Sequence, residues 1–302
     1  MNKANSSLYS YNKHFNFINS LFLNKKLPSS ILFSGEKGIG KRTFLFHFLA
    51  YIESEENKKK KYLENFQIEN RDFFEKISNN QYDNIKVIQK GEKSSHITID
   101  QIRDVISSCS YESFLGKARF VLILNAEDLN LNASNALLKI LEKPPENTYF
   151  FLVKNSDGLV ASTILSRCFK LNIRISKLEL ESVFKKLLVD FDLQEFDNFD
   201  IFNEFDTPGS KINRILHLKD RSIDSFQLIN LVIYCLNDFK KNKIQNSLTY
   251  GVEFAKNFFF KQFKCNYKKS NYFYNLFVKN VNDSLRINAD LNAAVKILKK
   301  VA

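Results

Sequence analysis

Apolar runs and helical stripes alternate along the first part of the chain. The run "SSILFSG" at Ser29–Gly35 leads into "KRTFLFHFLAYI", whose apolar residues can face a core along a helix. A second run, "NIKVIQ" at Asn84–Gln89, is followed by "TIDQIRDVISSC", in which Thr98 and Gln101 match a capping box. In this second helix, apolar side chains recur at steps of three and four residues: Ile99, Ile102, Ile106 and Cys109. Each pair of segments predicts a strand that leads into a helix.

The alternation continues toward the middle of the chain. "RFVLILN" at Arg119–Asn125 is a nearly continuous apolar run, as expected of a central strand that helices bury on both faces. The next segment, "NASNALLKILEKPP", carries a helical stripe and ends at Pro144–Pro145. That stripe consists of Ala133, Leu137, Ile140 and Leu141. "TYFFLV" at Thr148–Val153 predicts one more strand. Residues 1–174 are therefore predicted to form a three-layer α/β domain with a parallel sheet.

After about residue 175 the pattern becomes helical. "KLELESVFKKLLVDFDL" and later segments carry helical periodicity without a clear strand, and "DTPGSK" at Asp206–Lys211 interrupts them. The last stretch, "DLNAAVKILKK", places Leu291, Ala294, Val295 and Leu298 on one helical face. The second part of the chain is predicted to be all-helical.

The length and composition limit the classes of protein to which this chain can belong. A chain of 302 residues exceeds the usual size of one core, so we expect two or three domains. The sequence has no run of about 18 apolar residues, and the segment "MNKANSSLYSYNKHF" lacks the apolar part of a secretory signal. We therefore expect a soluble, cytoplasmic protein with no membrane partner. The cysteines form no C-x-x-C pair, and the four histidines are dispersed, so we predict reduced thiols and no zinc or other metal site. The cysteines are Cys109, Cys168, Cys235 and Cys265.

The formal net charge of +12 has two interpretations. It suits an acidic partner such as nucleic acid, and it also suits the Lys-, Asn-, Phe- and Ile-rich composition that an A+T-biased genome produces. The run "NKKKKY" at Asn57–Tyr62 is interpreted as a solvated loop or helix end. The segment "NFFFKQFKCNYKKSNYFY" keeps DNA binding as a hypothesis, because bases can stack on aromatic rings between lysines. Phe258, Phe259 and Phe263 in that segment are interpreted more simply as core.

The stretch "GEKGIGKRT" at Gly35–Thr43 is the clearest candidate for chemistry. Gly35, Gly40 and Lys41 fit the G-x-x-x-x-G-K frame, in which backbone N–H groups cradle phosphate and the lysine reaches the outer phosphates. A magnesium-dependent site needs a small hydroxyl at the next position. This chain has Arg42 there, and Thr43 comes one residue late.

The segment at Val121–Cys168 resembles the core of bacterial clamp-loader subunits of the AAA+ class, and most of all the delta-prime subunits of DNA polymerase III. Two motifs carry the resemblance: Asn135 to Lys139 ("NALLK") with Leu141-Glu142 and Pro144-Pro145, and Thr163 to Cys168 ("TILSRC"). The likeness extends upstream to "ILFSGEKGIGK" and "IDQIR" and, weakly, to "INADLNAAVKILKK". It implies an AAA+ P-loop-type module at residues 1–174, a small helical lid at 175–222, and a helical collar for oligomerisation at 223–302.

The resemblance also shows which catalytic parts are missing. Hydrolysis in such modules needs an acidic pair after the third strand, and here Asn125 and Ala126 occupy those positions. Glu127 and Asp128 come two residues late and are interpreted as acids at the start of the following turn. Losing the metal hydroxyl, the metal carboxylate, the base and, at Ile212, the lid sensor together, at about 2 to 4 kcal/mol each, predicts no useful ATP turnover.

Two further positions that contact the nucleotide in ATP-hydrolysing relatives also differ in this chain. Lys154-Asn155 stands where relatives have a polar sensor, and Ile212 stands at the lid sensor, with Arg214 just beyond. No cofactor is required in this interpretation. Weak binding of ATP or ADP at Gly38–Lys41 and a purely structural turn are both kept as interpretations.

By the same resemblance, Arg167 is an arginine finger that acts in trans on the ATP site of a neighbouring subunit. Ser166 and Cys168 are expected to position the loop rather than to react. The implied partners are gamma/tau-type ATPase subunits and the delta subunit, with the sliding clamp and primer-template DNA reached through the complex. The first hypothesis is a non-catalytic clamp-loader subunit; the alternatives are an active ATPase of the same fold and a stand-alone basic DNA-binding module.

Overall fold

The computed structural model describes residues 5–68, 72–91, 94–110, 117–197, 199–203, 206–219, 227–263, 266–287 and 291–302. The chain divides into two compact units, Met1–Val183 and Phe184–Ala302. The division into three domains that the sequence suggests stays a prediction.

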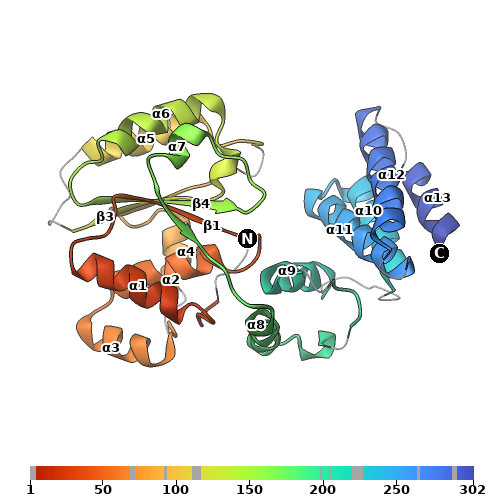
Figure 1. Ribbon diagram of the computed structural model, residues 1–302, viewed down its shortest axis with the longest axis horizontal. Coiled ribbons are helices and arrows are strands. Elements are labelled where there is room, and N and C mark those ends of the chain that lie inside the picture. The colour runs from red at the N-terminus through yellow and green to blue at the C-terminus, as the bar shows by residue number, and fades with distance from the viewer. Residues whose placement is uncertain are drawn as a thin grey trace. The chain divides into compact units, whose positions relative to one another are not determined.

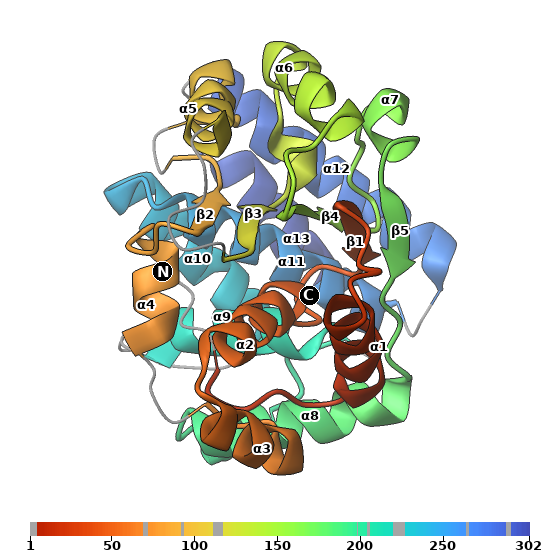
Figure 2. The same cartoon turned by 90° about the vertical axis from the view of Figure 1, so that its left-hand side faces the viewer.

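The first unit is built on a parallel sheet whose strand order is β2-β3-β4-β1-β5 (Figure 2). Its strands are β1 (Ser30–Gly35), β2 (Ile85–Ile88), β3 (Arg119–Ile123), β4 (Thr148–Asn155) and β5 (Phe169–Asn172). All pairings in this sheet are parallel. β3 is buried along its whole length, as its uninterrupted apolar run predicts.

Helices cover both faces of the sheet (Figure 1). One face carries α5 (Ile99–Ser110), α6 (Leu131–Glu142) and α7 (Ser162–Leu165). The other face carries α1 (Asn12–Leu23), α2 (Lys41–Glu53), α3 (Glu56–Asn65) and α4 (Asp72–Ser78). Side chains alternate between two cores, so that Ile31 and Phe33 pack on one face and Leu32 packs on the other. The expected three-layer α/β module is confirmed.

Phenylalanine fills the core beneath α1 and α2. Phe15, Phe48, Phe120 and Phe151 are all fully buried, and their rings meet edge-on or tilted. Such ring contacts add about 0.5–1.5 kcal/mol per pair beyond the burial of area. In a chain without Trp, this aromatic layer supplies the volume that holds the loop-bearing strand and helix together.

One strand was missing from the prediction. β5 was not predicted, because Phe169, Lys170 and Asn172 are exposed at a sheet edge and leave no apolar run. The run Asn57–Tyr62 begins in the first turn of α3, in keeping with its interpretation as a helix end, and Tyr62 is buried against the aromatic core. The capping box is confirmed, since the backbone N–H of Thr98 donates to Gln101 Oε1 at 3.0 Å.

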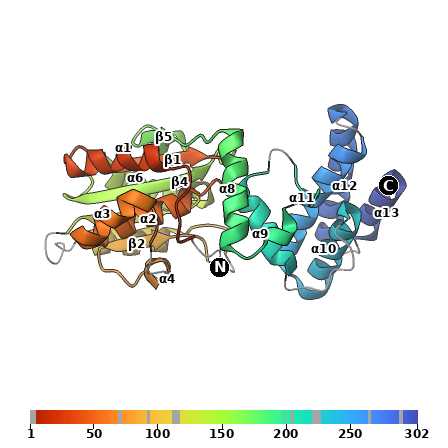
Figure 3. The same ribbon diagram turned by 90° about the horizontal axis from the view of Figure 1, so that it is seen from below.

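The second unit is helical in its described part, as expected. Its helices are α9 (Pro208–Lys219), α10 (Leu228–Asn242), α11 (Gln245–Gln262), α12 (Tyr267–Arg286) and α13 (Asn292–Val301), and α8 (Lys177–Asp190) crosses the boundary between the units. Short helical turns also occur, η2 (Ala126–Asp128) in the first unit and η3 (Gln194–Phe196) in the second. α11 packs on α10, α12 on α11 and α13 on α12, and Figure 3 shows these four helices as one bundle. Phe258 and Phe259 lie in this core and Phe263 packs against it, as the sequence predicts; Cys265 lies outside the described residues.

A buried arginine links α9 to the bundle. Arg214 is fully buried, and its Nη2 lies 2.7 Å from Asp206 Oδ2 while its Nε lies 3.6 Å from Glu253 Oε2. The guanidinium also stands over the rings of Phe202 and Phe254, 5.2 Å and 5.6 Å from their centroids. A charge removed from water in this way is stable only while its partners stay in place.

We expect Arg214→Ala to lower the free energy of unfolding by about 3 kcal/mol, because two carboxylates lose their counter-ion and two rings lose a packing partner. Urea denaturation followed by far-UV circular dichroism measures this. The control is Arg286→Ala, which removes an exposed arginine from α12 and should change stability by less than about 0.5 kcal/mol. Equal losses in the two variants would contradict the assigned role of the buried cluster.

Candidate functional site

The glycine-rich loop follows β1 at the carboxyl edge of the sheet. Gly40 has φ 99°, a left-handed conformation that suits glycine, and α2 begins at the next residue. At Gly35 an added Cβ would lie 2.7 Å from Ile39 Cδ1 and 2.8 Å from the carbonyl oxygen of Ile173. The loop therefore packs tightly against the chain's own side chains. Gly38 is also left-handed, with φ 84°.

The ammonium of Lys41, the lysine of the loop, forms its hydrogen bonds with acceptors of the chain itself. Lys41 Nζ donates to the carbonyl oxygens of Gly35 at 2.8 Å and Glu36 at 2.7 Å, and to Asn155 Oδ1 at 3.1 Å. Lys41 is only 5% exposed. Burial lowers the pKa of its ammonium from 10.5 to about 8, although the carboxylates of Glu127 and Asp157 act in the opposite direction. The ammonium thus holds the loop to the end of β4.

Arg42 serves the packing of helices instead of a metal site. Its Nη2 donates to Ser78 Oγ on α4 at 3.0 Å, and its guanidinium stands over the ring of Phe46 at 4.9 Å. Burial lowers its pKa. Thr43 is half-buried one residue further along α2. The residue at the metal-hydroxyl position therefore joins α2 to α4.

The turn after β3 brings an unexpected carboxylate to the loop. Asn125 is left-handed with φ 58°, and Ala126 is buried, so neither offers an anion. Glu127 Oε1 accepts from the backbone N–H of Asn155 at 3.2 Å and from its Nδ2 at 2.6 Å. Glu127 Oε2 is buried and has no hydrogen-bond partner among the described residues. Asp128 instead lies 3.5 Å from Lys90 Nζ.

Sequence reasoning missed this placement of Glu127. The interpretation as an acid of the following turn is correct for its position in η2, but the side chain reaches across to β4. The usable signal was Asn155, because β3 and β4 are parallel neighbours and their carboxyl ends meet at one edge. Gly158 permits the approach, since a Cβ there would lie 2.8 Å from Glu127 Cδ. Glu127, Asn155 and Lys41 therefore form one connected network.

A cavity of about 600 Å³ lies beside the loop within the first unit. Its charged lining consists of Glu36, Lys154, Lys170 and Arg174. Lys154 Nζ donates to the carbonyl oxygen of Gly158 at 2.8 Å. The excess of cations favours an anion at this edge of the sheet.

The sequence Ser166-Arg167-Cys168 immediately precedes β5, at the amino end of that strand. The glycine-rich loop instead follows the carboxyl end of β1. Arg167 Nε donates to Glu142 Oε1 at 3.0 Å, its Nη2 contacts the same oxygen, and its Nη1 donates to the carbonyl oxygen of Thr163 at 2.9 Å. The Arg167 side chain remains 33% exposed. Ser166 Oγ donates to the same carbonyl of Thr163 at 3.0 Å. Cys168 is buried, which raises the pKa of its thiol to about 11 and leaves it protonated at neutral pH.

Ile212 and Arg214, which the sequence suggested as lid contacts for a nucleotide, are buried in the second unit. Ile212 is 3% exposed within a hydrophobic cluster that includes Phe184 and Leu188. Arg214 lies in the ion cluster with Asp206 and Glu253. Both side chains are therefore used for packing within their own unit.

The described residues contain neither a cluster suited to a metal ion nor a helix suited to a membrane. In this part of the chain, no group of three or more His, Cys, Asp or Glu is arranged to hold a metal ion. Nor does any helix described here combine the length and the apolar character that a membrane span requires.

The depressed pKa of Lys41 predicts a pH dependence of stability. Between pH 8 and 10.5 the unfolded chain binds this proton more tightly than the folded chain, so the contribution of Lys41 to the free energy of unfolding should rise with pH. The raised pKa of the Cys168 thiol acts in the opposite direction, so the contribution of Lys41 is obtained by comparing variants. The expected gain is about 2 to 3 kcal/mol across the window. Denaturation with urea at pH 8 and at pH 10 measures it. Lys41→Met should remove most of this gain, whereas Lys60→Met, at an exposed position of α3, should keep it; the same pH profile in both variants would contradict the assignment.

Comparison with known proteins agrees with the motifs. The family model described as DNA polymerase III, delta subunit, matches residues 11–177. The delta-prime subunit of DNA polymerase III from Pseudomonas aeruginosa is 38% identical over 82 residues, which are 27% of this chain and 25% of that protein. The tau subunit of DNA polymerase III from Escherichia coli is 30% identical over 105 residues, 32% of this chain and 16% of that protein. The matched segments thus span a quarter or less of the length of these relatives.

Among solved structures, a DNA polymerase III gamma subunit-related protein from Thermotoga maritima aligns over 94% of this chain and 98% of its own, with 16% identity and a TM-score of 0.49. The expected fold class, a parallel α/β module followed by helices, is confirmed by the strand order and the succession of elements. The family model covers more than half of the chain, and the expected resemblance to delta-prime subunits is confirmed by the curated relatives. The chain therefore belongs to the DNA polymerase III delta subunit family.

Proposed function

We propose that this chain is a non-catalytic clamp-loader subunit of the delta-prime type. It supports ATP-dependent loading of the sliding clamp on primed DNA by placing Arg167 in the ATP site of a neighbouring gamma/tau-type ATPase subunit. The delta subunit, the clamp and primer-template DNA are reached through the complex. In this role the chain needs no cofactor of its own, because the nucleotide belongs to the neighbour.

The observation that carries the proposal is the position of Arg167 in the sheet. Phe169, at the start of β5, lies opposite Ile31, and Gly35 follows four residues later along β1. At about 3.3 Å per residue, this offset places about 13 Å between the start of β5 and the glycine-rich loop. Arg167 lies two residues before β5, at the amino end of that strand. This offset supports a contact between Arg167 and the triphosphate of another molecule.

The state of the guanidinium supports the same role. One N–H of Nη2 stays free when the other donates to Glu142, because each terminal nitrogen carries two hydrogens. The side chain is one-third exposed, so a phosphate can approach without any rearrangement of the core. An exposed pair such as Arg167–Glu142 contributes about 1 kcal/mol or less to stability, so it does not explain the arginine as a structural residue.

The chain's own loop supports a non-catalytic role. Arg42 packs against α4 at the metal-hydroxyl position, and Asn125 and Ala126 occupy the positions of the acidic pair. Lys41 donates to two loop carbonyls and to Asn155, so a phosphate would have to displace these contacts. Each missing contact to the metal or to the charge of the transition state costs about 2 to 4 kcal/mol.

A second candidate function, an active ATPase of the same fold, is favoured by one observation. Glu127 places a buried carboxylate beside Asn155, which itself contacts Lys41. A carboxylate so close to the loop could polarise water if nucleotide and metal were bound. Its two hydrogen bonds to Asn155 instead hold it as a positioning group in our proposal.

We expect the complete ring, reconstituted with tau-type ATPase and delta subunits, to lose ATP turnover with Arg167→Ala. At the site that this chain completes, the loss should be about tenfold or more, because a finger contributes at the transition state. Arg167→Lys should restore little of it, since an ammonium lacks the fork of the guanidinium. Arg103→Ala, which removes another exposed and ion-paired arginine, is the matched control and should leave turnover unchanged. Unaltered turnover with Arg167→Ala would exclude the finger role.

The isolated chain distinguishes the two candidate functions. We expect no ATP hydrolysis above background with magnesium, because the metal hydroxyl and the acidic pair are absent. If the isolated wild-type chain hydrolysed ATP and Glu127→Gln abolished that activity, the chain would be an active ATPase and the non-catalytic role would be refuted. Phosphate release by the purified wild-type and variant chains is the measurement.

A further inference from the structure

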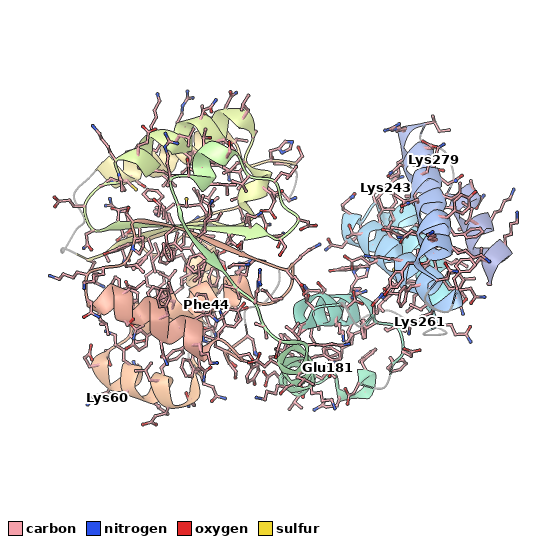
Figure 4. The ribbon with its side chains drawn as sticks, viewed as in Figure 1. Phe44, Lys60, Glu181, Lys243, Lys261 and Lys279 are labelled. Carbon is pink, nitrogen blue, oxygen red and sulfur yellow. The ribbon has the colours of Figure 1, made fainter. Side chains whose placement is uncertain are left out.

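The outer face of α12 carries an unusual row of polar side chains. Six exposed residues recur at helical steps of three and four and so share one narrow stripe. They are Lys268, Tyr272, Asn275, Lys279, Asn282 and Arg286. Over 18 residues the stripe is about 27 Å long, at about 1.5 Å per residue. Lys279 marks its middle in Figure 4.

The surrounding bundle concentrates positive charge on its surface. Helices α10, α11, α12 and α13 contain eleven Lys or Arg and three Asp or Glu. Two of the three acids are used by other side chains: Ser247 Oγ donates to Asp238, and Glu253 lies 3.6 Å from buried Arg214. Asp283, beside the stripe, is the remaining acid of these helices. The field over α12 is therefore strongly positive.

A solvated helix in a lysine-rich chain does not need this pattern. The exposed residues of α8 mix both signs, with Glu179 and Glu181 among Lys177, Lys185 and Lys186. On the α12 stripe the three cations outnumber the acids: exposed Asp283 lies one helical turn from Lys279 and from Arg286, and none of the three cations has an ion-pair partner among the described residues. Composition bias alone would enrich lysine without reducing Asp and Glu on this face to one.

Tyr272 gives the stripe a second chemical property. Its side chain is 64% exposed in the middle of the charged row. An exposed aromatic ring between cations is the arrangement that lets a base stack while its phosphates are neutralised. Asn275 and Asn282 add amide donors that reach phosphate oxygens.

We propose that the outer stripe of α12 binds single-stranded DNA. Lys268, Lys279 and Arg286 contact successive phosphates, and Tyr272 stacks on an unpaired base. Single strands fit better than a duplex, because a paired base cannot turn its face to a side chain on a smooth helix surface. This contact is independent of the glycine-rich loop and of Arg167.

The purified full-length chain tests the phosphate contacts by fluorescence anisotropy with a labelled 20-nucleotide oligothymidine in increasing NaCl. Replacing Lys268, Lys279 and Arg286 together by Gln should weaken binding about tenfold or more and reduce the slope of log affinity against log salt by about 2. The charge-matched control replaces exposed Lys60, Lys76 and Lys143 by Gln and should retain most of the affinity. Equal weakening in both triple variants would show an effect of net charge alone and overturn the proposal.

The stacking contact is tested separately. Tyr272→Leu should lower affinity for the oligothymidine about tenfold at constant salt, because one stacked base is lost. Tyr267→Leu is the matched control: Tyr267 is 56% exposed on the same helix, but it lies off the stripe and its ring packs against Phe260. A 20-base-pair duplex that binds as tightly as the single strand, or a Tyr272→Leu chain that binds normally, would overturn the assignment. Circular dichroism spectra that match wild type confirm that each variant is folded.

Discussion

Parallel pairing of β1 with both β4 and β5 is the constraint on which the placement of the two main motifs depends. The glycine-rich loop must leave the carboxyl end of β1, and Arg167 must enter from the amino end of β5. Because the strands run in the same direction, these two ends lie at opposite edges of the sheet. One module can therefore hold an arginine at one end of the strands while its own loop is at the other, as the contact proposed above with a neighbouring subunit requires.

The glycine-rich loop is held by contacts within its own unit. Glycine still permits the left-handed turns, but Lys41 donates to carbonyl oxygens of the same loop and to Asn155. Glu127 then fixes Asn155 from the neighbouring strand. Each of these side chains is a hydrogen-bond partner of the next, so the network needs no ligand to complete it. The lowered pKa of Lys41 reflects the burial of its ammonium in this arrangement.

In the second unit, acidic side chains are used in contacts within the fold, whereas most of the lysines lie on the surface. Arg214 is buried with two carboxylates and two aromatic rings, which fastens α9 to the bundle. Asp238 and Glu253 are used in such contacts, and the outer helices keep mainly lysines. The basic surface is therefore partly a product of folding, because the acids that would neutralise it serve the packing.

Periodicity along the chain was enough to predict the alternation of strands and helices and the helical second half. The glycine-rich motif and the resemblance to clamp-loader subunits indicated that a hydroxyl and an acidic pair are absent from their usual positions. These features depend on neighbours within a few residues, and local pattern reports them directly. β5 escaped prediction because an edge strand with exposed side chains needs no apolar run. The approach of Glu127 to Asn155, the burial of Arg214, and the separation of Arg167 from the loop were decided only by tertiary structure. Each of them joins residues far apart in the chain, and only the pairing of strands and the packing of helices determines which such residues meet.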